Sequence, residues 1–445
     1  MMRSLFSAVS GLKAHQTRMD VIGNNIANVN TVAYKAQNVT FGDVYYQTTQ
    51  TATGPNATSG KGGTNAKQIG LGSSVGAIST AIQNQGATER TDNPWDLCIS
   101  GDAFFVVNSA GNTYFTRSGD FKTDLSGALV TQSGAHVMGW KVDEDGAVVK
   151  DKVQPLYVTS SEYMYTAPAV TTAVEITGNV DERSKSDSVF TINFFDTLGN
   201  EYQAALTLSY VDPAGGGTAD DRASYQITGS TVTMNGVPTT LTVTTDQYIE
   251  FNKNTGVSME SNANITLTLT DADPDNSGIV MENIGVPGAD GTSTLTMDAT
   301  GLTMFADATD IKSYKGIDGK GAGKAVGKMT SVGINESGQI VASYSNGDTK
   351  TIGQIAVTTF PNPSGLEKIG DNLYAATLNS GSFDGIGQDI TESDGKISSG
   401  YLEMSNVDLA DQFTSMITTQ RGYQANSRII TVSDSMLEEL INLKR

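Results

Sequence analysis

The feature that most constrains this fold is a seven-residue repeat of apolar side chains at each extreme end of the 445-residue chain. Near the N-terminus the repeat is carried by Leu5, Leu12, Met19 and Ile26. Near the C-terminus it is carried by Leu409, Met416, Tyr423, Ile430 and Leu437. This spacing is typical of helices that pack in coiled coils. It predicts a coiled-coil helix over residues 1–30 and a longer one over 405–445.

A long isolated helix cannot bury an apolar stripe against itself, so both helices need partners. The C-terminal helix, with Ser405 and Asp408 resembling a capping box, would extend for roughly 57 Å at about 1.5 Å per residue. The shorter N-terminal helix could cover only part of it, which leaves the remainder for other copies of the chain. The alternative is that both are ordinary amphipathic helices of one globular core, although they lie at opposite ends of a chain whose middle is almost entirely β.

The middle of the chain has the patterns of β structure. Residues 31–70 contain a low-complexity stretch of Thr, Gly, Ser and Asn, which predicts an extended arm or linker. Residues 160–315 are rich in Thr that alternates with apolar residues, which predicts a separate β domain. Short apolar runs with turn signals flank it over 71–159 and 316–404. The expected fold is mostly β with α-helical termini, in which an inner β domain is split by an inserted outer β domain.

Charge is distributed unevenly along the chain, whose net charge is −20 at neutral pH. Residues 1–35 carry +3 and residues 405–445 carry −1, so the segment between them carries −22. An acidic middle argues against nucleic acid and anionic lipid as partners. Apolar runs are too short to span a bilayer, and no convincing cleavage site follows the N-terminal segment. We therefore expect no membrane insertion, and export by a route other than a cleaved secretory signal.

Signatures of catalysis are nearly absent from the sequence. There are two histidines, His15 and His136, and one cysteine, Cys98, whose apolar neighbours predict burial. The sequence lacks a metal-binding histidine pair, a phosphate-binding loop and a nucleophile elbow. We therefore expect no enzyme activity, no catalytic residue and no cofactor.

One acidic cluster matches part of the spacing of a calcium-binding loop. Asp271, Asp273, Asp275 and Glu282 occupy the first, third, fifth and twelfth positions of such a loop. However, Asn276 stands where the loop needs Gly, and the preceding segment has the alternation of a strand. An acidic β-turn explains the cluster better, and weak calcium binding is kept as a hypothesis for the outer domain.

Three segments resemble the rod and hook family of flagellar axial proteins: residues 1–35, 96–107 and 400–443. The most specific motif is the stretch from 24 to 31, which supplies the signature residues Asn24, Asn25, Ile26, Asn28, Asn30 and Thr31. The resemblance is strong at both ends and weak through 160–315. Ala33 and Ala103 stand where the family usually has Gly, which implies local variation of the backbone.

The resemblance implies a structural subunit that is exported unfolded through the flagellar type III apparatus and then polymerises with copies of itself. Its other partners would be flagellar rod, hook cap and hook–filament junction proteins, and its location would be the extracellular hook of the flagellar basal body. Distal rod proteins lack a large insert, so the insert at residues 160–315 favours a subunit of the hook over a distal rod or other hook-associated subunit. The hook would be a short curved tube that acts as a flexible joint and transmits torque from rod to filament. A β-rich adhesin or surface enzyme is the rival from another class, and it would not explain the repeats at both ends.

Overall fold

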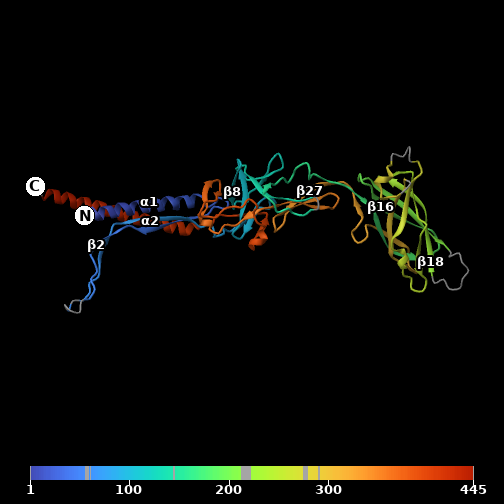
Figure 1. The fold of residues 1–445 in the computed structure, drawn as a ribbon, viewed down its shortest axis with the longest axis horizontal. Coiled ribbons are helices and arrows are strands. Elements are labelled where there is room, and N and C mark those ends of the chain that lie inside the picture. The colour runs from blue at the N-terminus through green and yellow to red at the C-terminus, as the bar shows by residue number, and fades with distance from the viewer. Residues whose placement is uncertain are drawn as a thin grey trace. The chain divides into compact units, whose positions relative to one another are not determined.

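The computed structural model describes residues 2–55, 60, 62–143, 146–211, 222–273, 279–288 and 291–443. The chain divides into two compact units. The first unit comprises Met1–Ser160, Val332–Ala342 and Lys350–Arg445, and the second comprises Ser161–Ser331 and Ser343–Thr349. Helices occupy the two ends of the chain and strands dominate between them (Figure 1). The predicted fold class, mostly β with helical termini, is therefore confirmed.

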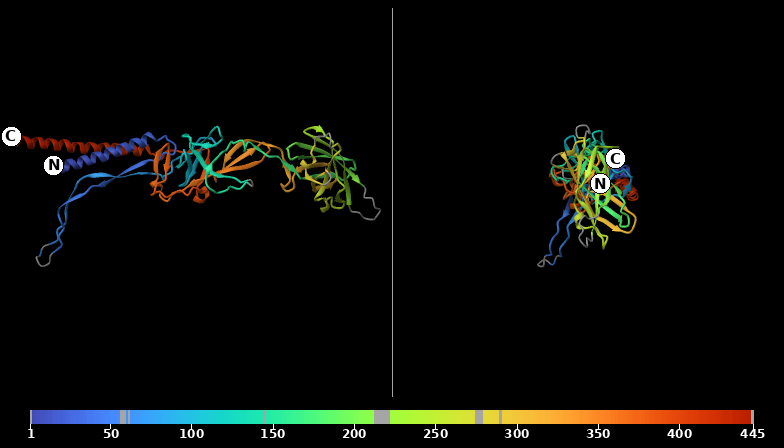
Figure 2. Two further views of the ribbon diagram at one scale, coloured as in Figure 1. Left: turned by 45° about the horizontal axis from the view of Figure 1, so that its top comes forward. Right: turned by 90° about the vertical axis from the view of Figure 1, so that its right-hand side faces the viewer.

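Two long helices form one part of the first unit. Helix α1 spans Met2–Ala27 and helix α2 spans Leu409–Asn442. They lie side by side and antiparallel, α1 in blue and α2 in red (Figures 1 and 2). Helix α2 begins later than predicted, because its N-cap is Asp408 and not Ser405. The Asp408 carboxylate accepts hydrogen bonds from the backbone N–H of Ala410 at 2.8 Å and of Asp411 at 3.3 Å.

The segment predicted as an arm or linker forms a two-stranded ribbon. Strand β1 (Gln37–Asp43) pairs with β4 (Ser73–Thr80), and β2 (Tyr46–Gln50) pairs with β3 (Lys67–Gly70), both antiparallel. The prediction was an extended arm or a linker, and the paired strands agree with the arm and not with an unstructured linker. The β-branched Thr residues of these strands favour such pairing. Strands β1 and β4 also pack along α1, whereas every residue of β2 and β3 is exposed.

The remaining strands of the first unit form what we call the inner β region. Its strands are β5 (Thr88–Arg90), β6 (Leu97–Ser100), β7 (Phe104–Ser109), β8 (Asn112–Thr116), β9 (Lys122–Thr123), β10 (Leu129–Val130), β11 (His136–Lys141), β12 (Gln154–Pro155), β29 (Thr349–Ile355), β30 (Val357–Thr358), β31 (Glu367–Gly370), β32 (Leu373–Ala375), β33 (Lys396–Ser399) and β34 (Tyr401–Glu403). Strand β7 pairs with β8, β11 and β30. Phe104, Phe115 and Trp140 are almost completely buried and belong to one hydrophobic core.

Most strands of the second unit belong to two sheets. Its strands are β13 (Tyr165–Thr166), β14 (Ala169–Thr171), β15 (Ala173–Asp181), β16 (Ser188–Phe195), β17 (Glu201–Val211), β18 (Arg222–Met234), β19 (Val237–Pro238), β20 (Leu241–Thr244), β21 (Tyr248–Asn252), β22 (Ile265–Asp271), β23 (Val286–Pro287), β24 (Ser293–Phe305), β25 (Asp310–Lys315) and β26 (Ala322–Lys324). One sheet has the order β20-β22-β24-β15-β25, and the other has the order β16-β17-β18-β19.

Alternation of side chains explains the core of this second unit. Along β22 the apolar residues Ile265, Leu267 and Leu269 are completely buried, whereas the intervening Thr266 is exposed. Such alternation places apolar side chains on one face of a sheet and hydroxyls on the other. Buried residues from both sheets then join in one hydrophobic core.

The inserted unit extends further along the chain than the predicted end at residue 315. The Gly- and Lys-rich stretch after 315 contains β26, which pairs with β14, so it is part of the unit and not its exit. Next to it, Thr166 of β13 lies opposite Gly327 of β27 (Gly327–Ile334). Strands β27 and β28 (Gln339–Tyr344) contribute residues to both units. Pairing between strands more than 150 residues apart thus sets the boundary.

Candidate assembly site at the chain ends

The buried residues of α1 and α2 are mostly small or polar. They are Ala8, Gly11, Ala14, Ile22 and Asn25 on α1, with Gln412, Thr419 and Ser433 on α2. Side chains of the opposite helix lie close to two glycines. A Cβ on Gly11 would lie 2.8 Å from Asn426 Nδ2, and a Cβ on Gly422 would lie 2.7 Å from His15 Cε1. The two helices therefore pack closely at Gly11 and Gly422.

The residues of the predicted heptad seams are less buried than these. Seven of them are half-buried: Leu5, Leu12, Met19, Ile26, Met416, Ile430 and Leu437. Leu409 and Tyr423 are exposed, at 39% and 42% of their full surface. Further large apolar side chains of α2 are exposed as well: Phe413, Ile417, Ile429, Val432, Met436, Leu440 and Ile441. Helix α1 leaves this apolar surface of α2 uncovered.

Asn25 is the centre of the asparagine-rich signature after α1. It is 1% exposed, and both ends of its side-chain amide are hydrogen-bonded. Its Nδ2 donates to Gln37 O at 2.8 Å and to Gln412 Oε1 at 3.1 Å. Its Oδ1 accepts from Gln37 N at 3.0 Å and from Tyr34 Oη at 3.2 Å. Asn25 thus joins α1, the chain that follows it, and the first turn of α2.

The other signature residues shape the end of α1. Asn24 Nδ2 donates to Tyr34 Oη at 3.1 Å, and Asn28 Nδ2 donates to Asn24 O at 2.9 Å. Thr31 Oγ1 donates to Asn28 Oδ1 at 3.1 Å, whereas Asn30 is exposed and Ile26 is half-buried. Side chains that bond to their own backbone compete with helical hydrogen bonds, which explains why α1 ends at Ala27.

The two ends of the chain meet just beyond the helices. Ala33 N donates to Glu403 O at 2.7 Å. Ala33 has a φ of 55°, in the left-handed region that favours Gly, which accounts for the family's usual Gly at this place. Asn406 Oδ1 accepts from Ala36 N at 2.7 Å, and Asn406 Nδ2 donates to Ala81 O at 2.9 Å. The segments that lead into α1 and α2 are therefore held together.

A buried ionic cluster lies at the same junction. Lys35 Nζ lies 2.6 Å from Glu403 Oε1, and Arg117 Nε lies 3.4 Å from Glu403 Oε2. All three side chains are 1% exposed. Burial lowers the pKa of Lys35, and the neighbouring Glu403 carboxylate opposes that shift. Sequence reasoning missed this cluster, because a single sequence does not reveal pairings across several hundred residues. The only signal was a lysine among apolar residues at 32–36.

The structure describes three of the four acidic residues of the calcium hypothesis, namely Asp271, Asp273 and Glu282. Asp271 Oδ1 accepts hydrogen bonds from Thr240 Oγ1 at 2.5 Å and from Asp273 N at 3.1 Å. Glu282 lies in the 3₁₀ turn Met281–Asn283, and Asp275 lies outside the described residues. Within the described part of the chain, no group of three potential metal-ligating side chains comes together. Calcium binding remains a hypothesis.

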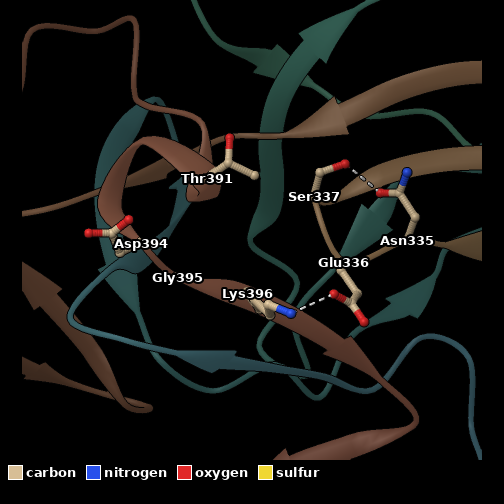
Figure 3. A pocket seen from close by; sticks show the side chains of 7 residues that line it. All are labelled: Asn335, Glu336, Ser337, Thr391, Asp394, Gly395 and Lys396. Carbon is tan, nitrogen blue, oxygen red and sulfur yellow. Dashed lines mark hydrogen bonds and ion pairs between the residues drawn. The ribbon is translucent and has the colours of Figure 1, made fainter.

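A shallow pocket lies in the first unit between Asn335–Ser337 and Thr391–Lys396 (Figure 3). Lys396 Nζ pairs with Glu336 Oε2 at 3.0 Å, and Ser337 Oγ donates to Asn335 Oδ1 at 2.8 Å. This lining does not place a general base beside the serine.

Cys98 is buried in β6, as its apolar neighbours predicted. Among the described residues, no helix is long and apolar enough to cross a bilayer.

Comparisons with known proteins match both chain ends and the inner β region. Residues 5–35 match the family model described as flagella basal body rod protein. Residues 98–180 match the model for the flagellar hook protein FlgE/F/G D1 domain, and residues 398–443 match the flagellar basal body rod FlgEFG protein C-terminal model. The matched ranges contain the three residues of the buried ionic cluster, Lys35, Arg117 and Glu403.

Full-length relatives carry the names of flagellar proteins. The chain is 36% identical to flagellar hook protein FlgE of Borreliella burgdorferi over 477 residues, covering all of both chains. It is 35% identical to flagellar hook protein FlgE of Treponema pallidum, again over the whole of both. It is 31% identical to flagellar basal-body rod protein FlgG of Bacillus subtilis, with the same coverage. The solved Helicobacter pylori flagellar hook protein FlgE2 is 14% identical and covers 71% of this chain, with a TM-score of 0.44.

Proposed function

This chain belongs to the family of flagellar hook proteins and is a structural subunit of the hook, and on that premise we propose that it polymerises through the apolar surface that α2 leaves exposed. The observation that carries the proposal is the contrast between the two sides of α2. Its buried residues, Gln412, Thr419 and Ser433, are polar, whereas the large apolar residues Phe413, Ile417 and Tyr423 are exposed. Apolar surface of this extent on a long helix favours contact with further helices.

The residues predicted for the helical seams are the proposed contacts between subunits. They are Leu5, Leu12, Met19, Ile26, Leu409, Met416, Tyr423, Ile430 and Leu437. Their partial exposure within one subunit supports this role, because further burial is available to each of them on assembly. The role of the signature residues, with Asn25 as their centre, is to fix the direction in which α1 and α2 leave the inner β region.

The finer functional assignments follow from the family and remain proposals. We propose an extracellular location in the hook, export through the type III apparatus, and contacts with rod, hook cap and hook–filament junction proteins. The joint would transmit torque through the helices and bend through the Thr-rich second unit, because polar faces form hydrated contacts that re-form readily. Because the family is structural, we also propose that this chain has no catalytic activity.

Replacing Tyr423 by Asp tests the proposal. A carboxylate at a contact that becomes buried on assembly costs several kcal/mol per subunit, so Tyr423→Asp should abolish tubes in electron micrographs. Circular dichroism of the β units should stay unchanged. The matched control is Gln424→Asp, one residue further along α2 on its polar side, which should form normal tubes. Normal tubes from Tyr423→Asp would remove Tyr423 from the proposed contact.

A further inference from the structure

The chain contains two asparagine–glycine pairs, Asn235–Gly236 and Asn346–Gly347, and both lie in the second unit. In such a pair the backbone nitrogen of the glycine can attack the side-chain carboxamide of the asparagine. The attack is easier than in other dipeptides, because glycine has no side chain to obstruct the approach. The same reactive group thus occurs twice within one folded unit, in two different surroundings.

The carboxamide of Asn346 is held from both sides. Its Nδ2 donates hydrogen bonds to Thr166 Oγ1 at 3.2 Å and to Ala325 O at 3.0 Å. Its Oδ1 accepts a hydrogen bond from Asp348 N at 3.0 Å. Its Cγ packs against Gly327, where an added Cβ would lie only 2.6 Å away. Attack on this Cγ would therefore require several hydrogen bonds to break in a closely packed place.

The carboxamide of Asn235 is free by comparison. Asn235 and Gly236 form the turn between β18 and β19, in which Met234 lies opposite Val237, and both turn residues are exposed. Among the described residues, none makes a hydrogen bond with the Asn235 side chain or with Gly236 N. A Cβ on Gly236 would have no neighbouring atom within 4 Å. Both reacting groups are therefore open to solvent.

The turn must open briefly for these two groups to meet. Asn235 and Gly236 have φ values of 51° and 85°, in the left-handed region, and attack requires the peptide bond between them to rotate. Strand β19 is an edge strand of two exposed residues. One of them, Pro238, has no N–H to donate to Thr233 on the opposite strand. Opening such a hairpin tip costs much less free energy than unfolding the whole unit.

From this contrast we propose that Asn235 is a site of spontaneous deamidation and that the fold protects Asn346. Gly236 N loses its proton to solvent and attacks Asn235 Cγ. The N–Cγ bond forms, the Cγ–Nδ2 bond breaks, and ammonia leaves with a proton taken from water. Water then adds to one of the two carbonyls of the resulting succinimide ring and opens it to aspartate or isoaspartate. Water is the sole co-reactant, and the step needs neither an oxidant nor an enzyme.

The product changes both the charge and the backbone of the hairpin tip. The new carboxylate adds to the negative charge of the acidic middle of the chain. Isoaspartate also adds one methylene group to the main chain, so Met234 and Val237 lose their register. The core is preserved, because Val232, the buried residue of β18 nearest to the turn, lies before this pair. The modified fraction increases with the age of the protein, whatever contacts the subunit makes.

Peptide mapping by mass spectrometry measures both sites in one sample of the full chain. The folded chain and the chain in denaturant would be incubated in parallel at mildly alkaline pH, so that each site has its own unfolded reference. Folding should slow the deamidation of Asn346 at least about tenfold more than that of Asn235. The control Asn235→Gln should abolish modification at residue 235, because glutamine must close a larger ring, and should leave Asn346 unchanged.

Equal protection of the two sites by folding would overturn the proposal. So would a folded chain that remains unmodified at Asn235 while the denatured chain reacts there. Thr166→Val removes one hydrogen bond from Asn346 Nδ2 and should speed deamidation at that site, whereas an unchanged rate would contradict the assigned cause. Circular dichroism shows whether this variant is folded, and if it is not, the comparison of the two sites in the unsubstituted chain decides.

Discussion

The second unit and the helix pair bury their side chains in opposite ways. In the second unit, completely buried residues such as Phe194, Leu206 and Leu267 pack between two sheets, and the threonines face outward. In the helix pair, glycines and polar residues such as Gly11 and Thr419 fill the contact, and the large apolar side chains of α2 face outward. One region buries its own hydrophobic surface, whereas the other leaves that surface exposed, and we propose that neighbouring subunits cover it. On this proposal, stability and assembly depend on different parts of one chain.

Removing the inserted unit is the largest change that this comparison allows. Thr166 and Gly327 are opposite each other in an antiparallel pair, so a short Gly/Ser turn can replace residues 167–326. Tubes should still form, because both helices and the inner β region remain, but their curvature should change. Negative-stain microscopy of hooks would measure this. Inserting the same turn at Asn235–Gly236, without deletion, is the control and should leave curvature unchanged.

That deletion can also break the comparison. If the shortened chain is folded and exported but forms no tubes, then the inserted unit carries contacts that assembly requires. The division between a self-contained unit and an assembling helix pair would then be wrong.

A cavity in the second unit should affect stability without affecting assembly. Leu267→Ala removes a completely buried side chain, which typically costs about 2–5 kcal/mol. The thermal unfolding of the second unit should shift to lower temperature, as followed by circular dichroism. Thr266→Ala on the exposed face is the control and should change little. If Leu267→Ala forms no tubes at a temperature where the second unit remains folded, then assembly depends on the second unit as well as on the helix pair.

Acid should loosen the helix pair before it affects the β units. Burial, and to a smaller extent the charge of Arg18, lowers the pKa of His15, which lies against Gly422. The unfolded state therefore binds more protons near pH 6.5, so this contribution to stability is present above about pH 6.5 and is lost as the pH falls below it. Helical circular dichroism between about pH 8 and pH 5 would measure the change. In His15→Gln this contribution to the pH dependence should disappear.

Two glycines of α1 sharpen the comparison at the smallest scale. Gly→Ala within a helix normally stabilises it by up to about 1 kcal/mol. Gly23→Ala should follow this rule, because a Cβ there has no neighbouring atom within 4 Å. Gly11→Ala should lose that gain, because its Cβ would lie 2.8 Å from Asn426 Nδ2. Thermal melting of the helical signal distinguishes the two, and equal gains would contradict the close approach of the helices.

Local patterns predicted much of this molecule. The helical ends followed from the spacing of residues such as Leu12 and Tyr423, and the β character of the second unit followed from alternation such as Leu267 with Thr268. Both patterns lie within a few turns or one strand, where periodicity decides which face is apolar. The ribbon at β2 and β3 was missed, because Thr- and Gly-rich composition suits a linker as well as an exposed hairpin.

The sequence by itself determined which side chains are available: apolar rows at both ends, an asparagine-rich signature, and an acidic middle that alternates like a sheet. The tertiary structure alone decided which of them meet. Lys35, Arg117 and Glu403 become partners only after strands and turns bring three distant segments together. Likewise, Gly11 and Gly422 place a polar seam between the helices, because only the folded backbone brings them within van der Waals distance of Asn426 and His15. Periodicity acts along the chain, whereas such pairings depend on closure of loops hundreds of residues long.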